Sequence, residues 1–216
     1  MDVRFHKEVS IPVGKVTVQG ELIIPLIAKA VIIFSHGSGS SRFSTRNRMV
    51  AKYLHEKNFG TLLFDLLTEE EDQDYDNRFD IDLLTERLTG ATKWLQELDA
   101  VKDCRIGYFG ASTGAASALK AAAILPNINA VVSRGGRPDL AMDDLHLVEA
   151  PTLLIVGSLD YDVLQLNKEA YEQMKCEKKL EAVEGATHLF EEPGKIEIVS
   201  KLAAHWFEKY LIFINA

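Results

Sequence analysis

The sequence predicts an α/β fold: one domain, residues 1–216, built on an eight-stranded, mostly parallel sheet with helices on both faces. Three observations lead to this prediction. Short β-branched and apolar runs alternate with helical patterns along the chain. Most of these runs are continuous rather than alternating, as is typical of strands buried on both faces. The chain also shows no internal repeat or linker, and its length is sufficient for one hydrophobic core without disulfides or a structural metal.

The first two strands are expected to form an antiparallel hairpin. They cover Val3 to Val9 and Val16 to Ile24, with a turn at Pro12 to Gly14 between them. The six later runs predict buried parallel strands, because helices on both faces exclude water from them. These runs are Ala30 to Phe34, Gly60 to Phe64, Arg105 to Phe109, Ala130 to Ser133, Thr152 to Val156 and Lys179 to Val183.

Helices are expected between these strands. Apolar residues recur at steps of three and four from Leu84 to Leu98, and again from Val199 to Tyr210. Each series predicts one apolar stripe that packs on the sheet. The stretch from Gly114 to Leu125 is rich in alanine and is followed by Pro126, so it predicts a helix in close contact with the strands.

Composition excludes several classes of protein. The formal net charge of −8, from 24 basic and 32 acidic residues, lacks the basic surface that nucleic-acid binding requires. The first residues carry no apolar signal segment, and no apolar run is long enough to cross a membrane. The two cysteines, Cys104 and Cys176, form neither a disulfide framework nor a zinc motif. We therefore expect a cytoplasmic protein without a metal, membrane or nucleic-acid partner.

The most specific motif is Gly110-Ala111-Ser112-Thr113-Gly114, which lies between a predicted strand and the alanine-rich helix. This is the G-x-S-x-G pattern of a nucleophile elbow in its proper context. A strand that turns sharply into a helix holds the serine in a strained backbone conformation, and the two glycines remove Cβ atoms that would collide. The motif predicts that Ser112 is a nucleophile.

A serine nucleophile needs a base and an acid that orients the base. Asp160 follows the strand Thr152 to Val156 and is the candidate acid, with Asp162 as an alternative that suits a helix cap. Among six histidines, only His188 follows a late strand, so it is the candidate base. Both candidates follow Ser112 in the order acid, then histidine, which is the order expected after a nucleophile elbow.

Two backbone amides are expected to bind the negatively charged oxygen of the reaction intermediate. One is the amide of Thr113, the residue after the nucleophile. The other comes from the loop Ser35 to Ser41, where we select Ser38. This glycine-rich and serine-rich loop lacks the lysine of a phosphate-binding P-loop.

With this elbow, acid, histidine and His36-Gly37 loop in order, the chain resembles the α/β-hydrolase superfamily over most of its length. Its compact size and the strand ending at Pro25 are most similar to the dienelactone hydrolase-like branch. The resemblance implies the α/β-hydrolase fold and a cofactor-independent hydrolase of small ester, lactone or related acyl substrates. One departure is the nucleophile: dienelactone hydrolases proper use cysteine where this chain has Ser112, so lactone ring-opening does not carry over with it.

The resemblance places cap domains after the sixth strand, but only 16 positions separate Gly135 from Pro151, so no cap domain is expected. His36 and Arg134 are candidate substrate contacts. Arg134 and Arg137 would suit an anionic substrate, although salt bridges to the acidic segment, Glu69 to Asp80, are the favoured alternative. That segment carries seven acids and one base, Arg78.

Two further functions remain compatible with the sequence. A binding module can keep the elbow without the chemistry, because one fold hosts many functions. The same three residues can also hydrolyse a thioester or a carbon–carbon bond, and only pocket contacts would distinguish these reactions.

Overall fold

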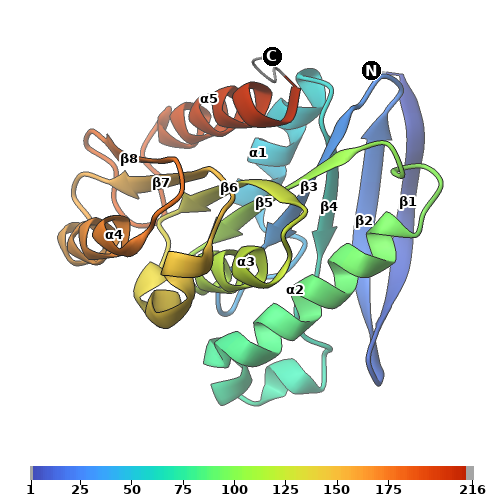
Figure 1. Ribbon diagram of the computed structural model, residues 1–216, viewed down its shortest axis with the longest axis horizontal. Coiled ribbons are helices and arrows are strands. Elements are labelled where there is room, and N and C mark those ends of the chain that lie inside the picture. Colours follow the sequence, from blue (N-terminus) through green and yellow to red (C-terminus); the bar gives the residue numbers. More distant parts are fainter. Residues whose placement is uncertain (1, 213–216) are drawn as a thin grey trace.

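The computed structural model describes residues 2–212. Its eight strands form one sheet in the order β1-β2-β4-β3-β5-β6-β7-β8 (Figure 1). The first two pairings, β1 with β2 and β2 with β4, are antiparallel, and the other five are parallel. The strands are β1 (Val3–Val13), β2 (Val16–Pro25), β3 (Ala30–Ser35), β4 (Gly60–Phe64), β5 (Arg105–Ala111), β6 (Ile128–Arg134), β7 (Thr152–Gly157) and β8 (Lys178–Val183). The predicted eight-stranded sheet is confirmed.

Helices cover both faces of this sheet, as predicted (Figure 1). On one face, α1 (Thr45–Glu56) and α5 (Lys195–Phe207) enclose an apolar cluster that contains Phe34 and Phe109. On the other face lie α2 (Ile81–Gln96), α3 (Thr113–Ile124) and α4 (Tyr161–Gln173). Shorter helical segments are η1 (Glu71–Gln73), η2 (Asp76–Phe79), η3 (Pro138–Leu147) and the π-helical η4 (Glu208–Ile212).

The element boundaries differ from the sequence prediction by a few residues. Strand β1 continues past Val9 to Val13 and includes Pro12, which is tolerated because β1 is an edge strand. Helix α2 ends at Gln96, before Leu98, although Leu98 still packs against the core. The turn of the hairpin uses Gly14 with a φ of 59°, a conformation that favours glycine.

The segment between β6 and β7 contains only η3, so the absence of a cap domain is confirmed. Within residues 2–212, no helix combines the length and the apolar character that a membrane crossing requires. The cytoplasmic location expected from the sequence stays a prediction.

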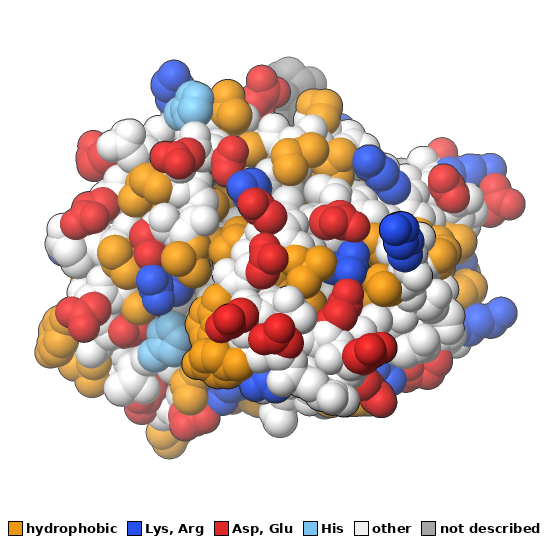
Figure 2. All heavy atoms as spheres, turned by 90° about the horizontal axis from the view of Figure 1, so that it is seen from below, with side chains coloured by type: hydrophobic (Ala, Val, Ile, Leu, Met, Phe, Trp, Pro, Cys, Tyr) orange, Lys and Arg blue, Asp and Glu red, His pale blue; other side chains and the backbone are white. Residues whose placement is uncertain are grey.

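The parallel strands end at one edge of the sheet, and the loops that follow them carry the candidate functional residues. The acidic segment after β4 forms η1 and η2 near the start of α2, at the bottom of Figure 1. Figure 2 looks onto this end of the molecule and shows acidic side chains gathered across its centre.

The stability of this fold is expected to fall between pH 7 and pH 5 because of His55, in the last turn of α1. Its Nε2 contacts the Thr61 hydroxyl at 2.7 Å, and burial lowers its pKa to about 4. Between these two pH values His55 becomes protonated in the unfolded chain but stays neutral in the folded chain. Acid therefore favours unfolding. We predict that His55→Gln reduces the difference in unfolding free energy between pH 7 and pH 5 by about 1 kcal/mol, allowing for partial exposure.

Urea unfolding at both pH values measures this difference. His205→Gln, which changes an exposed histidine on α5, is the control. An unchanged pH dependence in His55→Gln would contradict the prediction.

Candidate active site

Ser112 lies between β5 and α3 in the strained conformation that the motif predicts, with φ 52° and ψ −122°. The two flanking glycines explain why the turn is possible. A Cβ atom at Gly114 would lie 2.2 Å from the carbonyl oxygen of Ser35, and one at Gly110 would lie 2.5 Å from Cα of Ala115. Since both contacts are with backbone atoms, side chains cannot move to relieve them, and only glycine fits at either position.

The predicted acid and base form a hydrogen-bonded pair. Asp160 follows β7 and occupies the N-cap position of α4 without capping the helix through its side chain. Its Oδ2 lies 2.7 Å from Nδ1 of His188, which is in the loop after β8. The Asp160 side chain is 15% exposed and that of His188 is 36% exposed. The alternative acid, Asp162, is exposed in the first turn of α4 and does not contact the histidine within hydrogen-bond distance.

The start of the segment after β6 connects this pair with the elbow. The amide of Ser112 donates to the carbonyl of Arg134 at 3.2 Å. At the next residue, Gly135, a Cβ atom would lie 3.6 Å from Cε1 of His188. Among residues 2–212, no hydrogen bond joins the hydroxyl of Ser112 to the ring of His188. The structure thus places all three residues in loops at one edge of the sheet, where Asp160 and His188 are in hydrogen-bond contact.

The two predicted oxyanion donors differ in availability. Thr113 is the first residue of α3, so its amide has no acceptor within the helix. The amide of Ser38 instead donates to Oγ1 of Thr113 at 2.9 Å. This contact is not predictable from the sequence, because a threonine after the nucleophile gives no signal of where its hydroxyl points. An oxyanion would have to share or replace this bond.

His36, a candidate substrate contact, is buried and bonded to backbone through both ring nitrogens. Nδ1 donates to the carbonyl of Gly37 at 3.0 Å, and Nε2 accepts from the amide of Leu66 at 3.1 Å. Burial lowers the pKa of His36, which fits the neutral ring that these two bonds require. His36 therefore joins the loop after β3 to the loop after β4, and both ring nitrogens are occupied.

Neither Arg134 nor Arg137 forms a salt bridge with the acidic segment, so that favoured alternative is wrong. Arg137 pairs with Asp139, two residues away, through two hydrogen bonds of 2.9 and 2.8 Å. The acids of this segment instead pair with Arg78, which lies within the segment, and with Arg87 of α2. Arg78 pairs with Asp72 at 2.9 Å, and Arg87 of α2 pairs with Glu71 at 2.6 Å. Arg134 donates to Oδ1 of Asn47 at 3.3 Å and has no carboxylate within salt-bridge distance among residues 2–212.

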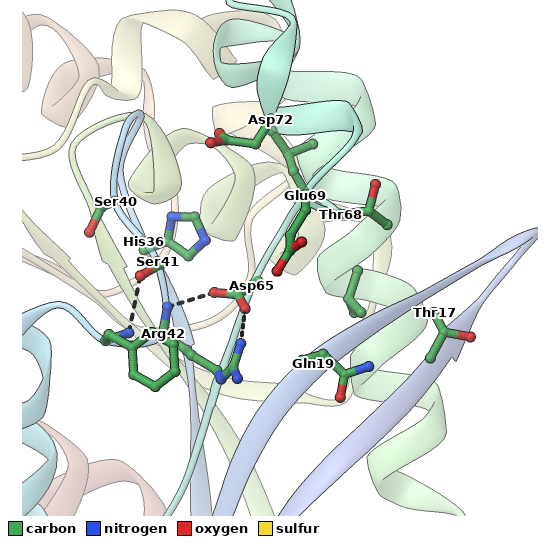
Figure 3. Close-up of a pocket in the computed structure, with 13 residues that line it drawn as sticks. Thr17, Gln19, His36, Ser40, Ser41, Arg42, Asp65, Thr68, Glu69 and Asp72 are labelled. Carbon is green, nitrogen blue, oxygen red and sulfur yellow. Dashed lines mark hydrogen bonds and ion pairs between the residues drawn. The ribbon is translucent and has the colours of Figure 1, made fainter.

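A cavity of about 460 Å³ lies beside the loop after β3 (Figure 3). Its wall includes His36 and hydroxyl side chains from several elements, and Figure 3 shows Asp65, Glu69 and Asp72 around it. Arg42 and Asp65, which both line the cavity, pair with each other. The lining contains none of Ser112, Asp160 and His188, so this cavity is a neighbour of the elbow and not its immediate surroundings.

Comparison with known proteins identifies the family and agrees with the fold. The model of the dienelactone hydrolase family matches residues 18–216. A crystal structure of a dienelactone hydrolase from Anabaena variabilis is 50% identical, with a TM-score of 0.93, and the match covers 96% of this chain and 98% of that one. Est1E from Butyrivibrio proteoclasticus shares the fold at 16% identity, with a TM-score of 0.81 and coverage of 94% and 98%.

Two curated relatives have a name that does not refer to hydrolases. A "putative phosphoribosyl transferase" is found in two strains of Mycobacterium tuberculosis, and each copy is 53% identical over 206 residues. The match covers 95% of this chain but only 46% of the relative, so the chain spans about half the length of these proteins.

The glycine requirement of the elbow is testable. Alanine normally stabilises a helix by about 1 kcal/mol relative to glycine. At Gly114, however, the added Cβ would meet two backbone carbonyl oxygens at 2.2 and 2.3 Å. We predict that Gly114→Ala lowers the unfolding free energy by about 3 kcal/mol or prevents folding, as measured by urea denaturation.

Gly194→Ala is the matched control. At Gly194 there is open space and a φ of 81°, so the substitution costs only backbone strain of about 1 kcal/mol. If both variants lose the same unfolding free energy, close packing at the elbow is not what requires glycine at position 114.

Proposed function

Because the chain belongs to the dienelactone hydrolase family, we propose that it is a serine hydrolase that cleaves small ester or related acyl substrates through an acyl-enzyme on Ser112. The observation that carries this proposal is the 2.7 Å contact between His188 Nδ1 and Asp160 Oδ2 at the sheet edge that also presents the strained Ser112. A buried or half-buried carboxylate that orients an imidazole is what a serine nucleophile requires.

In the first half of the reaction, Nε2 of His188 takes the proton of the Ser112 hydroxyl as Oγ attacks the acyl carbon. The bond between that carbon and the leaving oxygen then breaks, and the leaving oxygen receives the proton from His188. In the second half, water attacks the acyl-enzyme, gives its proton to His188, and releases the acid as Ser112 regains a proton. Asp160 stays ionised and holds the Nδ1–H tautomer throughout.

The missing hydrogen bond between Ser112 and His188 does not oppose this mechanism. Catalytic hydrogen bonds are often long in the free enzyme and tighten when substrate binds. His188 is 36% exposed and lies in the loop after β8, so its ring is not enclosed on all sides. The amide of Thr113 is free to bind the oxyanion, and Ser38 would contribute the second amide once Thr113 Oγ1 shares or releases it.

The phosphoribosyl transferase name of the curated relatives is not carried over to this chain. The chain corresponds to only 46% of those proteins, and its family match is to hydrolases. Thioester and carbon–carbon bond hydrolysis use the same three residues and remain alternatives within this proposal.

Substitution of each aspartate in turn distinguishes Asp160 from Asp162 as the acid that orients His188. Asp160→Asn is expected to lower kcat for a short-chain p-nitrophenyl ester by about 10⁴-fold, because the amide favours the wrong histidine tautomer. Asp162→Asn removes an equal charge two residues away and is expected to leave kcat within about two-fold. A larger loss in Asp162→Asn than in Asp160→Asn would contradict the assignment.

A fluorophosphonate probe separates the enzyme from a binding module. We predict that the probe labels the folded protein at Ser112, and that Ser112→Ala is neither labelled nor active on the ester. Mass spectrometry of the labelled peptide provides the measurement. If Ser112→Ala retains the ester turnover of the original protein, the proposed nucleophile is wrong, and a protein with neither labelling nor turnover would be a binding module.

A further inference from the structure

The amide of Ser38 is aimed at one acceptor by the peptide unit to which it belongs. The carbonyl of that unit, from Gly37, accepts two hydrogen bonds, one from Nδ1 of His36 at 3.0 Å and one from the amide of Ser40 at 3.2 Å. Because a peptide unit is planar and trans, its N–H points away from its C=O. The Ser38 amide therefore points away from these two bonds, and it donates to Oγ1 of Thr113 at 2.9 Å.

His36 keeps this peptide unit in place. Its ring is buried, and its Nε2 accepts a hydrogen bond from the amide of Leu66 at 3.1 Å. Burial lowers the pKa of His36, so at neutral pH the ring stays uncharged, with one nitrogen as donor and the other as acceptor. If the Ser38 amide turned from Thr113 to a substrate, the peptide unit would rotate and both bonds to the Gly37 carbonyl would break. Release of Ser38 is therefore unfavourable.

Thr113 has two hydrogen-bond donors that the fold leaves unused. Its amide is at the start of α3, where no carbonyl of the helix can accept it. Its hydroxyl accepts from Ser38, and this is the only hydrogen bond that the hydroxyl forms with residues 2–212. A hydroxyl that accepts one bond still has its own proton to donate. Because Thr113 is only 2% exposed and an unpaired buried donor is costly, both donors indicate a ligand atom.

These two donors lie beside the nucleophile. Thr113 follows Ser112 directly in the chain. The loop that carries Ser38 also contacts the nucleophile, since a Cβ atom at Gly37 would lie 3.0 Å from Cβ and 3.7 Å from Oγ of Ser112. The bond between Ser38 and Thr113 thus joins the two backbone segments that border the Ser112 hydroxyl. The amide and the hydroxyl of Thr113 stem from one Cα atom, so a single oxygen can accept from both.

We propose that the hydroxyl of Thr113 is a catalytic donor to the oxyanion, together with the amide of the same residue. The Ser38 amide stays bonded to Oγ1 and acts through it, because a hydroxyl that accepts a hydrogen bond becomes a stronger donor. This inference rests on the proposed function and names a further catalytic group of the same site. The donors are in place before substrate binds, and such preorganised donors stabilise developing charge most strongly.

Thr113→Val tests this role, because the alternative predicts the opposite change. Valine has the shape of threonine without the hydroxyl. We predict that kcat and kcat/KM for a short-chain p-nitrophenyl ester fall together by about 100-fold, since the lost contact forms only as the oxyanion develops. The same substitution frees the Ser38 amide. If that amide itself binds the oxyanion, the variant keeps or exceeds the original kcat, and the proposal is overturned.

Thr113→Ser is the conservative variant. It keeps the hydroxyl and removes only the methyl group, so kcat is expected to stay within about five-fold of the original value. A loss as large as that of Thr113→Val would assign the effect to packing of the methyl group, and would also overturn the proposal.

Thr92→Val is the matched control. Thr92 of α2 is also a buried threonine, and its hydroxyl bonds to the carbonyl of Leu88 and to the hydroxyl of Tyr108, both at 2.7 Å. This variant is expected to be less stable to urea but to keep kcat within about two-fold. An equal loss of kcat in Thr92→Val and Thr113→Val would contradict a specific role for Thr113. If Thr113→Val does not fold, Thr113→Ala also removes the hydroxyl and carries the same opposite predictions.

An alkylboronic acid provides a measurement that needs no turnover. Its boron bonds to Oγ of Ser112 and becomes a tetrahedral anion like the reaction intermediate, while the serine proton passes to His188. Calorimetry is expected to show binding about 100-fold weaker in Thr113→Val, and within about five-fold of the original in Thr113→Ser. Equal affinity in the original protein and in Thr113→Val would overturn the proposal.

Failure of this inference is distinguishable from failure of the proposed function. If the original protein hydrolyses the ester and Thr113→Val retains its kcat, only the role of the Thr113 hydroxyl is wrong. If the original protein neither hydrolyses the ester nor reacts with the fluorophosphonate at Ser112, the proposed function fails, and the catalytic role of Thr113 fails with it.

Discussion

The close approach of β5, α3 and the loop after β3 is the constraint on which the site depends. Only hydrogen at Gly114 lets the start of α3 lie against the carbonyls of Ser35 and His36. That approach forces Ser112 into its strained conformation and turns its hydroxyl toward Gly37, where a Cβ atom would lie 3.7 Å from Oγ. It also brings Ser38 within reach of Thr113. The strain is sustained by buried packing on both faces of the sheet.

Most of the architecture follows from local signals. Continuous apolar runs mark strands that helices cover on both faces, and the G-x-S-x-G motif combines strand, turn and helix in five residues. The choice between Asp160 and Asp162 was open at that level, because both fall in the same turn. The structure shows why one has the better geometry: Asp160 sits before the first turn of α4 and its side chain is free to reach His188.

The partners of charged side chains are the feature that the sequence predicts least well. Salt bridges from Arg134 and Arg137 to the acidic segment were the favoured expectation, and neither forms. In the fold, the alternation of side chains along β6 sends Arg134 toward α1, while Arg78 and Arg87 lie closer to the acids. Such directions depend on three-dimensional placement, as does the bond between Ser38 and Thr113, and composition does not reveal them.

The proposed mechanism requires that Ser112 becomes covalently acylated during turnover, which rapid quenching of the reaction with a p-nitrophenyl ester can detect. We expect a burst of about one p-nitrophenolate per protein molecule, together with the mass of the acyl group on the peptide that contains Ser112. Steady ester hydrolysis with the acyl group on another residue, or with no burst and no adduct under conditions where release of the acid is rate-limiting, would contradict it.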